Sequence, residues 1–320
     1  MNLFVIFYSG IFEVGYSVMT PAGSGEHVMP QNRPNNPVSV FSSACLPLFE
    51  SVVEHFQVLD STQTYIRFSM LNRITSSDSI ARLMCVSSEH QTQGRGKGDR
   101  HWFSDPGSKC LALSFGFVVP ENRLGDSAIL TQLLALSVVR AFPGLEFRIK
   151  WPNDLVIEGK KVGGILAEME PVGEGTYVMI IGVGLNLDIN SALLHSVQTR
   201  WPAGSLQAFC RPGVTIDLFE TRDCIIDIFR GFISIFLRNN PQEISLLTRE
   251  ISHSQFRYNE EIRFCSGDSI IRGVHRGLDP KGGLLISTTS SSSVSTFYSG
   301  ELVLDSVLYS DSPWFDSESA

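Results

Sequence analysis

The stretch KWPNDLVIEGKKVGG, residues 150–164, places one lysine at its start and two, Lys160 and Lys161, near its end. Between Lys150 and Lys161 the chain passes through Trp-Pro-Asn-Asp, a short apolar run and Glu158-Gly159. The residue before a proline is disfavoured in a helix, so the segment should begin as an extended turn. Glu-Gly between two apolar runs is typical of a β-hairpin. The stretch therefore predicts a hairpin with cations at both ends, although Lys160 or Lys161 taken alone is better explained as a solvated turn residue.

Apolar runs on both sides of this hairpin predict strands and helices. Strand-like runs lie at residues 81–89, 110–119, 145–151 and 175–189. Ser61 or Thr62 is a typical N-cap for a helix over the following residues, and Asp126 or Ser127 is the expected cap of an apolar helix that reaches residue 142. A further helical stretch covers residues 215–249. Together these segments predict an α+β domain.

Beyond residue 252 the pattern changes to short strands at close spacing with Gly, Asp or Ser turns, which predicts a small β-barrel. Residues 20–40 are dense in Pro, Gly and Asn, which is typical of a linker. We expect four regions: an extension and linker, partly disordered, at 1–45; the α+β domain at 46–252; the barrel at 253–308; and a disordered tail at 309–320.

The 320 residues carry a net charge of −8, with a pI near 5.4. This balance argues against a general nucleic-acid or membrane-surface binder, because the molecule as a whole repels phosphate. The six cysteines contain no Cys-x-x-Cys spacing, which is typical of reduced, mostly buried thiols in an intracellular protein. The apolar first residues lack the basic groups of secretory or mitochondrial signals. We expect a cytoplasmic protein, with mitochondrial delivery by an unusual signal left open.

A glycine-rich basic loop lies at EHQTQGRGKGDRHWFS, residues 89–104, in which glycines alternate with cations over 94–98. Glycines let backbone N–H groups turn toward an anion, and the cations add charge. The loop is not a P-loop, because no Gly-Lys-Ser/Thr ends it, and Asp99 stands where a dinucleotide fingerprint needs its third glycine. It is either an anion-binding loop or a solvated basic loop.

Two shorter motifs carry less information. GVGLNL, residues 182–187, places glycines inside a strand, which indicates close packing, and Asn186 could contact a nucleotide edge. DSTQ, residues 60–63, places two hydroxyls at a helix start, where they bind a small polar group or simply cap the helix. The histidines show no metal-ligand spacing, and no Ser, His and Asp arrangement indicates a nucleophile.

Taken in order, these motifs resemble those of the biotin protein ligases, over residues 60–304. The resemblance is carried by DSTQ, GRGKGDRHWFS, KWPNDL, KVGGIL, IGVGLN and GVHRGLDPKGGLLI. KWPNDL and KVGGIL match the family's most specific signature nearly letter for letter. The resemblance implies a class II synthetase-like catalytic domain, with a mixed β-sheet flanked by helices, and a small C-terminal SH3-like β-barrel.

The resemblance also implies a ligase reaction that uses ATP, Mg²⁺ and biotin. Biotin's carboxylate attacks the α-phosphate to give biotinyl-5′-AMP and pyrophosphate, and a lysine of a carboxylase carrier domain then takes the biotinyl group. Since one anion must approach another, cations in a water-poor site lower the barrier. Mg²⁺ is expected on the ATP phosphates, without protein ligands. We expect no nucleic-acid or membrane partner, and a monomer or homodimer.

The resemblance implies roles position by position. Lys161 and Arg95 would lie at the biotin carboxylate and α-phosphate, and Asp154 would accept a proton from the incoming amine. The implied biotin-binding residues are Ser61, Thr62, Gln91, Gly94, Arg95, Lys161, Gly163 and Gly164. The implied nucleotide-binding residues are Gly96, Lys97, Arg100, Trp102, Lys150, Asn153, Asn186 and Arg276.

Four residues, at three places in the chain, depart from the family pattern. Lys97 replaces an arginine, which keeps the charge and loses bidentate contact. Gly98-Asp99 brings an acid into the loop, which would slow adenylate formation or let the adenylate leak, and Gln63 replaces an asparagine. Residues 1–45 are too short and too rich in Pro and Gly for the DNA-binding domain of bifunctional members, so we expect the monofunctional form.

Three other functions stay open. A lipoate–protein ligase shares the fold and the adenylate chemistry but would lack KWPNDL and the terminal barrel. A non-enzymatic module would bind nucleic acid or another anion through the loop, and would respond to an oligonucleotide in a salt-dependent way. A degenerate ligase, for which Asp99 is the best support, would bind biotin without turning it over.

Overall fold

The structure is a computed structural model that describes residues 5–7, 50–75, 82–173, 175–196, 201–267, 269–288 and 293–303. Most of the expected linker and the expected tail lie outside these residues. The helices and strands are, in chain order, β1 (Val5–Phe7), β2 (Glu50–Leu59), α1 (Thr62–Thr75), β3 (Arg82–Gln91), β4 (Lys109–Pro120), the 3-10 helix η2 (Glu121–Asp126), α2 (Ile129–Ala141), β5 (Arg148–Lys150), β6 (Asp154–Ile157), β7 (Lys160–Gly173), β8 (Thr176–Asp188), α3 (Ser191–Ser196), the 3-10 helix η3 (Leu206–Phe209), α4 (Leu218–Arg238), α5 (Pro241–Ser254), β9 (Glu261–Ser266), β10 (Ser269–Leu278), β11 (Leu284–Thr288), β12 (Val294–Phe297) and β13 (Glu301–Val303).

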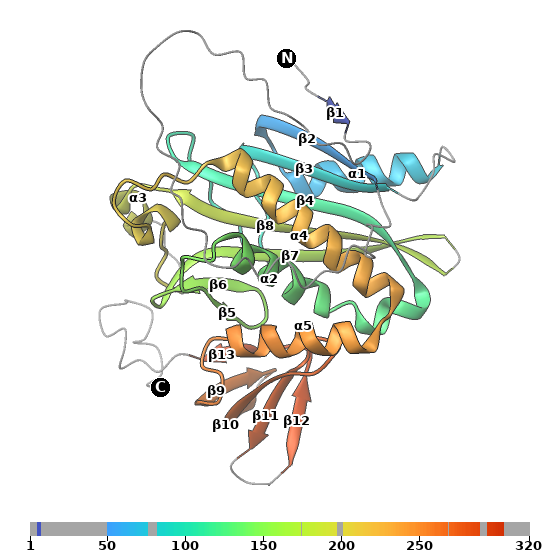
Figure 1. The fold of residues 1–320 in the computed structure, drawn as a ribbon, viewed down its shortest axis with the longest axis vertical. Coiled ribbons are helices and arrows are strands. Elements are labelled where there is room, and N and C mark those ends of the chain that lie inside the picture. Colours follow the sequence, from blue (N-terminus) through green and yellow to red (C-terminus); the bar gives the residue numbers. More distant parts are fainter. Residues whose placement is uncertain are drawn as a thin grey trace, which may run out of the picture.

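A mixed sheet of eight strands forms the centre of the molecule, in the order β1-β2-β3-β4-β8-β7-β6-β5 (Figure 1). β2 and β3 run parallel, and the other neighbouring strands run antiparallel. The parallel pair is joined through α1, because parallel neighbours need a crossover connection. The predicted α+β class is confirmed.

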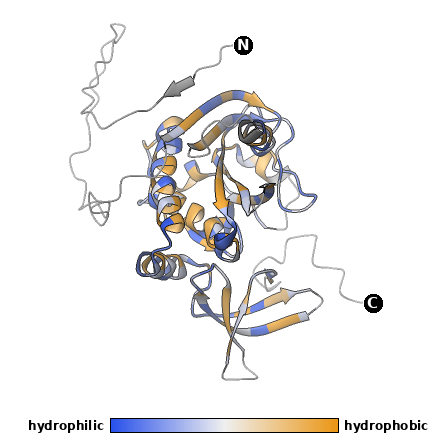
Figure 2. Cartoon of the chain, turned by 90° about the vertical axis from the view of Figure 1, so that its right-hand side faces the viewer, coloured by the Kyte–Doolittle hydropathy of each residue, from blue (hydrophilic) through white to orange (hydrophobic). Residues whose placement is uncertain are grey.

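The two faces of this sheet carry separate apolar cores. On one face, Ile66 and Met70 of α1 pack with Val178 and Ile180 of β8. The other face packs against α2 and α4, and its core takes the alternate residues of β8. Figure 2 shows the apolar residues running along the strands and along the helices beside them. Because successive strand residues point to opposite faces, the parity of each β8 residue decides which core it joins.

Local details differ from several predictions. α2 has Ala128 as its N-cap, without a side-chain cap, so the predicted caps are wrong. Asp126 ends the preceding 3-10 helix, where it pairs with Arg123 and Lys281. The helical stretch at 215–249 is two helices, because Asn239 adopts a left-handed conformation and Pro241 begins a new helix. β2 was not predicted, because Glu54 and other polar residues interrupt its apolar pattern.

The C-terminal region forms a second, antiparallel sheet of five strands, in the order β12-β11-β10-β9-β13. Figure 1 shows α5 between this sheet and the rest of the molecule. The two parts also meet at Trp151, whose indole N–H donates to the Gly282 carbonyl at 3.1 Å and whose ring centroid lies 5.7 Å from that of Phe264. The residues before β6 are therefore anchored on the second sheet.

Two other expectations concern the described residues only. The five cysteines among the described residues form no disulfide. Cys85 and Cys110 are buried, Cys210 and Cys265 are half-buried, and Cys224 is exposed. The expectation of buried thiols therefore holds for Cys85 and Cys110. Within these residues, no helix is long and apolar enough to cross a membrane.

Candidate functional site

Lys150 and Lys161 of the hairpin converge on one carboxylate. Lys161 Nζ lies 2.6 Å from Asp154 Oδ1, and Lys150 Nζ lies 3.3 Å from Asp154 Oδ2. Burial raises the pKa of the Asp154 carboxyl, but the two lysines outweigh it and hold the pKa below its usual value. Asp154 is therefore ionised in the folded protein, and it balances one buried cation and one that keeps 28% of its side chain exposed.

A β-bulge turns Lys161 toward this site. Val156 pairs with Lys161 and Leu155 pairs with Gly163, so Val162 is an extra residue in β7. Val162 lies in the main core, and a Cβ on Gly163 would point at Leu185 and Leu155 on the same face. Two successive residues thus face the core, and Lys161 and Gly164 face the other side, as a bulge allows. Gly163, a predicted biotin contact, lies on the core face.

The segment after residue 200 completes the lysine environment. Lys161 donates its backbone N–H to the Pro202 carbonyl at 2.7 Å, and its own carbonyl accepts from the Gly204 N–H at 2.8 Å. The Trp201 ring lies beneath Lys150, with Nζ 4.9 Å from the ring centroid. A cation over an aromatic face is stabilised by the ring quadrupole, so the Trp201 ring gives the buried Lys150 ammonium group a favourable contact.

Glycines on β7 and β8 let the Trp102 indole lie directly on the sheet. A Cβ on Gly184 would come within 2.4 Å of the ring, and a Cβ on Gly164 would lie 3.4 Å from it. Lys161 Nζ lies 5.9 Å from the Trp102 ring centroid. The glycines were predicted to permit close approach of another group. At Gly164 and Gly184 that group is the Trp102 ring, which lies beside Lys161.

Hydroxyl and amide groups cluster at the start of α1. The Thr62 N–H and hydroxyl both donate to Gln91 Oε1, at 2.8 and 3.1 Å, and the Thr62 hydroxyl also contacts Ser114 Oγ at 2.8 Å. Ser61 Oγ accepts from the Thr64 N–H at 3.4 Å. The side chains of Ser61, Thr62, Gln91 and Ser114 are buried, and that of Thr64 is half-buried. The predicted residues Ser61, Thr62 and Gln91 are thus brought together.

The glycine-rich loop folds as a narrow hairpin, and its Gly94 lies close to the Gln91 side chain of this cluster. Gly96 N–H donates to the Arg100 carbonyl, and Trp102 N–H donates to the Gly94 carbonyl, at 2.8 and 2.9 Å. A Cβ on Gly94 would lie 2.4 Å from the Trp102 carbonyl oxygen, so only glycine fits there. Lys97 and Arg100 at its tip are exposed. The loop has defined backbone pairing, and its tip carries the exposed cations.

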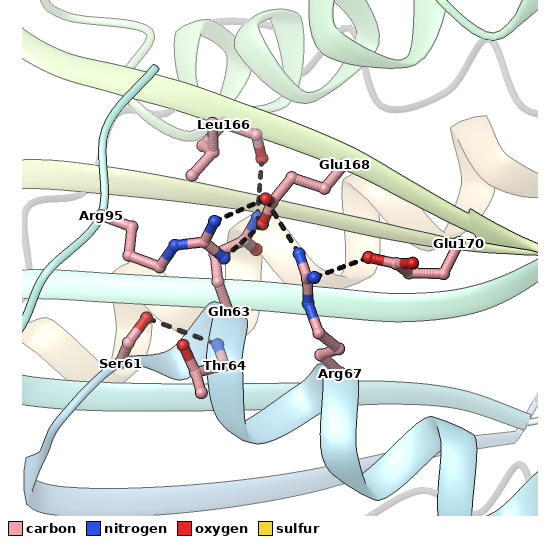
Figure 3. Close-up of polar contacts among 8 residues, drawn as sticks. All are labelled: Ser61, Gln63, Thr64, Arg67, Arg95, Leu166, Glu168 and Glu170. Atoms are coloured by element: carbon pink, nitrogen blue, oxygen red, sulfur yellow. Dashed lines mark hydrogen bonds and ion pairs between the residues drawn. The ribbon is translucent and has the colours of Figure 1, made fainter. Parts of the chain in front are cut away.

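Arg95 attaches the loop to Glu168 of β7, and residues of α1 contact the same carboxylate (Figure 3). It makes a bidentate ion pair with Glu168 of β7, with both N–O distances at 2.7 Å. Arg67 of α1 contacts the same carboxylate at 2.9 Å and Glu170 at 2.6 Å. The Gln63 amide nitrogen donates to Glu168 at 3.3 Å. We call these five residues the Glu168 cluster.

Other predicted residues are held by the backbone or lie elsewhere. Asn153 donates its amide to the Ile165 carbonyl at 2.7 Å, and Asn186 donates to the Gly204 carbonyl at 3.0 Å. Arg276 is exposed on β10 and donates to Asn259 Oδ1 at 3.4 Å. These contacts place Asn186 near the segment that pairs with Lys161, whereas the nucleotide role of Arg276 stays a prediction.

Sequence reasoning missed Trp201 and gave no role to Glu168 and Arg67. Glu168 and Glu170 are two residues apart in a strand, so they share a face, and this spacing beside an arginine-rich loop was an available signal. Trp201 had no such signal, because its position depends on how the chain returns to β7.

The chain matches known proteins over the same region. Residues 55–186 match the model of the biotin/lipoate A/B protein ligase family. The bifunctional ligase/repressor BirA of Escherichia coli is 28% identical over 231 residues, which are 72% of this chain and 67% of BirA. The biotin–[acetyl-CoA-carboxylase] ligase of Mycobacterium tuberculosis is 34% identical over 124 residues, 37% of this chain and 44% of that protein.

A solved structure agrees with the fold. The biotin protein ligase from Aquifex aeolicus, in complex with biotin and ATP, superposes with a TM-score of 0.59 at 25% identity, over 79% of this chain and 98% of that one. The matched residues include the start of α1, the glycine-rich loop and the lysine hairpin. Residues 55–186 of this chain therefore form a domain of the biotin/lipoate A/B protein ligase family.

Proposed function

We propose that this protein is an ATP-dependent biotin–protein ligase. It makes biotinyl-5′-AMP and transfers the biotinyl group to a lysine of a carboxylase carrier domain. The family match alone covers ligases of both biotin and lipoate. The relatives are named as biotin ligases, and the Aquifex structure contains biotin and ATP, which favours biotin here.

The observation that carries the proposal is the placement of Lys161. Its ammonium group lies beside Asp154, the Trp102 ring and Gly164 of β7. In the first half-reaction, an oxygen of the biotin carboxylate attacks the α-phosphorus of ATP, and the bond to the pyrophosphate oxygen breaks. Both reacting groups are anions, so a fixed cation stabilises the charge that they share in the transition state. We assign this role to Lys161.

Arg95 has a second role in the proposal. In the structure both of its terminal nitrogens bind Glu168. To fold over the carboxylate and phosphate, as proposed, Arg95 must share or exchange that contact for the ligand. Ser61, Thr62 and Gln91 would bind the ureido end of biotin, because their hydroxyl and amide groups lie together at the start of α1.

The nucleotide end is assigned to the other side of Lys161. Trp102 would shield the adenylate, and Lys150, Asn153 and Asn186 would hold the polar surroundings of the phosphates. The exposed Lys97 and Arg100 would reach the phosphates from the loop tip. Arg276 completes the proposed set from β10.

Asp154 is proposed to serve the second half-reaction. The amine nitrogen of the acceptor lysine attacks the biotinyl carbonyl carbon, the bond to the phosphate oxygen breaks, and AMP leaves. A free amine has a pKa near 10.4, so the attack must be coupled to loss of a proton. Asp154 is ionised and can accept a hydrogen bond or a proton from the amine, while Lys150 keeps its charge balanced.

Mg²⁺ is proposed to enter with ATP. Among the described residues, no group of three or more His, Cys, Asp or Glu could hold a metal ion, and the carboxylates near the site are paired with cations. These residues fit a metal that is bound by phosphate oxygens, where it would neutralise charge. We further propose that the C-terminal sheet is an SH3-like barrel, that the catalytic domain is class II synthetase-like over 46–252, and that the protein acts in the cytoplasm.

The direct test is pyrophosphate release with Mg-ATP and either biotin or lipoate, followed by transfer of labelled biotin to a carrier domain. We expect release with biotin and labelling of one lysine in the carrier domain. Release with lipoate alone would favour the lipoate ligase. Biotin binding without release would indicate a degenerate ligase.

A further inference from the structure

Gln132 is a buried polar residue in an apolar helix. The buried residues of α2 are apolar except Gln132 and Ser137. The Ser137 hydroxyl donates to the Leu133 carbonyl within the helix, at 2.9 Å. The Gln132 side chain, which is 1% exposed, instead contacts residues outside the helix. A buried amide costs stability unless its groups are paired, so the partners of Gln132 show what its side chain does.

The first partner of Gln132 belongs to the turn between β5 and β6. Gln132 Nε2 donates to the Pro152 carbonyl at 2.6 Å. Pro152 lies between Lys150, which ends β5, and Asp154, which begins β6. α2 packs beside β5 and β7 (Figure 1), so the contact runs directly from the helix to the turn. The helix therefore holds the turn that joins two charged residues of the candidate site.

The second partner of Gln132 is another buried glutamine. Gln132 Oε1 accepts from Gln255 Nε2 at 3.0 Å, and Gln255 is 2% exposed. Gln255 follows α5, where its backbone forms a β-bridge with Ile149, and the next residue, Phe256, donates its N–H to the Ile149 carbonyl at 2.9 Å. The two glutamines thus form a chain of hydrogen bonds from the end of α5, through α2, to Pro152.

This chain has one direction. A carbonyl oxygen only accepts, so Gln132 must present its N–H to Pro152 and its oxygen to Gln255. Among the described residues, the Oε1 atom of Gln255 is left without a hydrogen-bond partner. An unpaired buried acceptor costs stability, so stability alone does not account for this pair of glutamines. Departures of this kind are expected where a protein positions groups for function.

The neighbours of Pro152 in the turn are held by other groups. Asn153 Nδ2 donates to the Ile165 carbonyl at 2.7 Å, and the Ile165 N–H donates to the Asn153 carbonyl at 2.8 Å. Asp154 is held by its two lysines. Pro152 has no backbone N–H, so its carbonyl is the main-chain group by which it can be held. Gln132 supplies that contact.

We propose that Gln132 is a positioning residue for the ligase reaction, because its contact with the Pro152 carbonyl fixes the turn that carries Asp154. Gln255 keeps the Gln132 amide in the orientation that this contact needs. The inference rests on the proposed function. Asp154 in turn pairs with the Lys161 ammonium group, which meets the substrates. Charge-stabilising groups act when they are held in place before the reaction, so a looser turn lowers the rate without removing a group that binds biotin or ATP.

The test compares variants of the full chain. Gln132→Met fills a similar volume and removes both hydrogen bonds, whereas Gln255→Met removes only the donor that orients Gln132. Ser137→Ala is the matched control, because Ser137 is buried in the same helix and its hydroxyl donates within that helix. Biotin-dependent pyrophosphate release gives kcat and the KM values for biotin and ATP. Urea denaturation gives the folded fraction, so that kcat refers to folded protein.

We expect Gln132→Met to lower kcat by at least about tenfold, since small displacements at a reacting group lower the rate steeply. KM for biotin and for ATP should change by less than about twofold, which is the pattern for an interaction needed in the transition state. Gln255→Met should lower kcat by about threefold, and the double variant should be no slower than Gln132→Met, because both glutamines act through one contact. Ser137→Ala should keep the wild-type kcat.

Two results for folded variants would overturn the inference while the proposed function stands. One is a kcat of Gln132→Met within about twofold of wild type, which would show that Gln132 only stabilises the fold. The other is a double variant slowed by the product of the two single effects, which would show that the glutamines act independently. If Gln132→Met does not fold, Gln255→Met decides: an unchanged kcat overturns the inference, and a lower kcat with unchanged KM supports it. Absence of pyrophosphate release by wild type would overturn both the inference and the proposed function.

Discussion

Asp154 decides the electrostatics of the site at the scale of single residues. It pairs with Lys150, which is 3% exposed, and with Lys161. The Lys161 ammonium group also lies close to Gly164 and to the Trp102 ring. A buried ion pair is weak evidence for net stability, but loss of one partner leaves an uncompensated buried charge. The Asp154 carboxylate thus compensates the charge of both lysines at one place, which explains why the hairpin carries cations at both ends.

Asp154→Asn should therefore lower the free energy of unfolding by about 3 kcal/mol, mainly through the unpaired Lys150. Urea denaturation at pH 7 measures the change. Asp227→Asn is the control, because Asp227 is 69% exposed and its partner Arg230 is 25% exposed, so their pair should contribute less than about 1 kcal/mol. Since the pKa of Asp154 is lowered, its contribution exists above the usual carboxyl pKa and disappears as pH falls through the folded value. Equal losses for both variants would contradict this account.

At the scale of elements, turn chemistry was predictable and register was not. Glu158 and Gly159 both have positive φ, 49° and 74°, as the hairpin signal predicts. The bulge beside Lys161 depends on how β6 pairs with β7, which no local pattern contains. Similarly, β2 escaped prediction because its polar residues find partners only in the folded chain: Glu54 accepts from the Tyr65 hydroxyl, and His55 contacts Ser87. The site motifs were predictable because their residue types are specific, whereas the Glu168 cluster is made by tertiary contacts.

His275 gives β10 a pH dependence. Burial lowers the pKa of His275 to about 4, despite backbone contacts that raise it, and among the described residues its Nε2 has no partner. The folded state therefore favours the neutral ring. As pH falls from 6.5 to about 4, the unfolded state gains a proton that the folded state does not, so stability falls across that window by about 3 kcal/mol.

His275→Gln removes this titrating group, so stability should change less steeply with pH between 6.5 and 4 than it does in wild type. Urea denaturation of both proteins at intervals across that window checks the prediction. The same slope in the two proteins would show that other groups cause the wild-type dependence.

At the scale of the whole molecule, the second sheet is joined to the catalytic candidates through Gly282. This residue has a φ of +92°, accepts the Trp151 indole N–H, and would place a Cβ 2.8 Å from the Ile129 nitrogen of α2. Trp151 follows Lys150 directly in the chain. The C-terminal sheet thus supports the turn that leads into the site, and its effect on the chemistry is one of position.

Gly282→Ala should cost at least about 2 kcal/mol, because it adds a backbone clash to the strain of a positive φ. Gly267→Ala is the matched control: its φ is +59°, nothing lies within 4 Å of the added Cβ, and only the backbone cost of about 1 kcal/mol applies. Thermal unfolding and biotin-dependent pyrophosphate release are measured for both. We expect a lower Tm and slower release for Gly282→Ala than for Gly267→Ala, and equal values would show that the junction does not support the site.

The central claim is that Lys161 stabilises the meeting of two anions, and one comparison tests it most directly. Biotin-dependent pyrophosphate release is measured for wild type, Lys161→Ala and Lys160→Ala, in which the neighbouring lysine is exposed on the same hairpin. We predict that Lys161→Ala lowers kcat by at least about 100-fold, as expected for loss of one charge-stabilising group, and that Lys160→Ala stays near wild type. Equal activities for the two variants, both folded, would contradict the account.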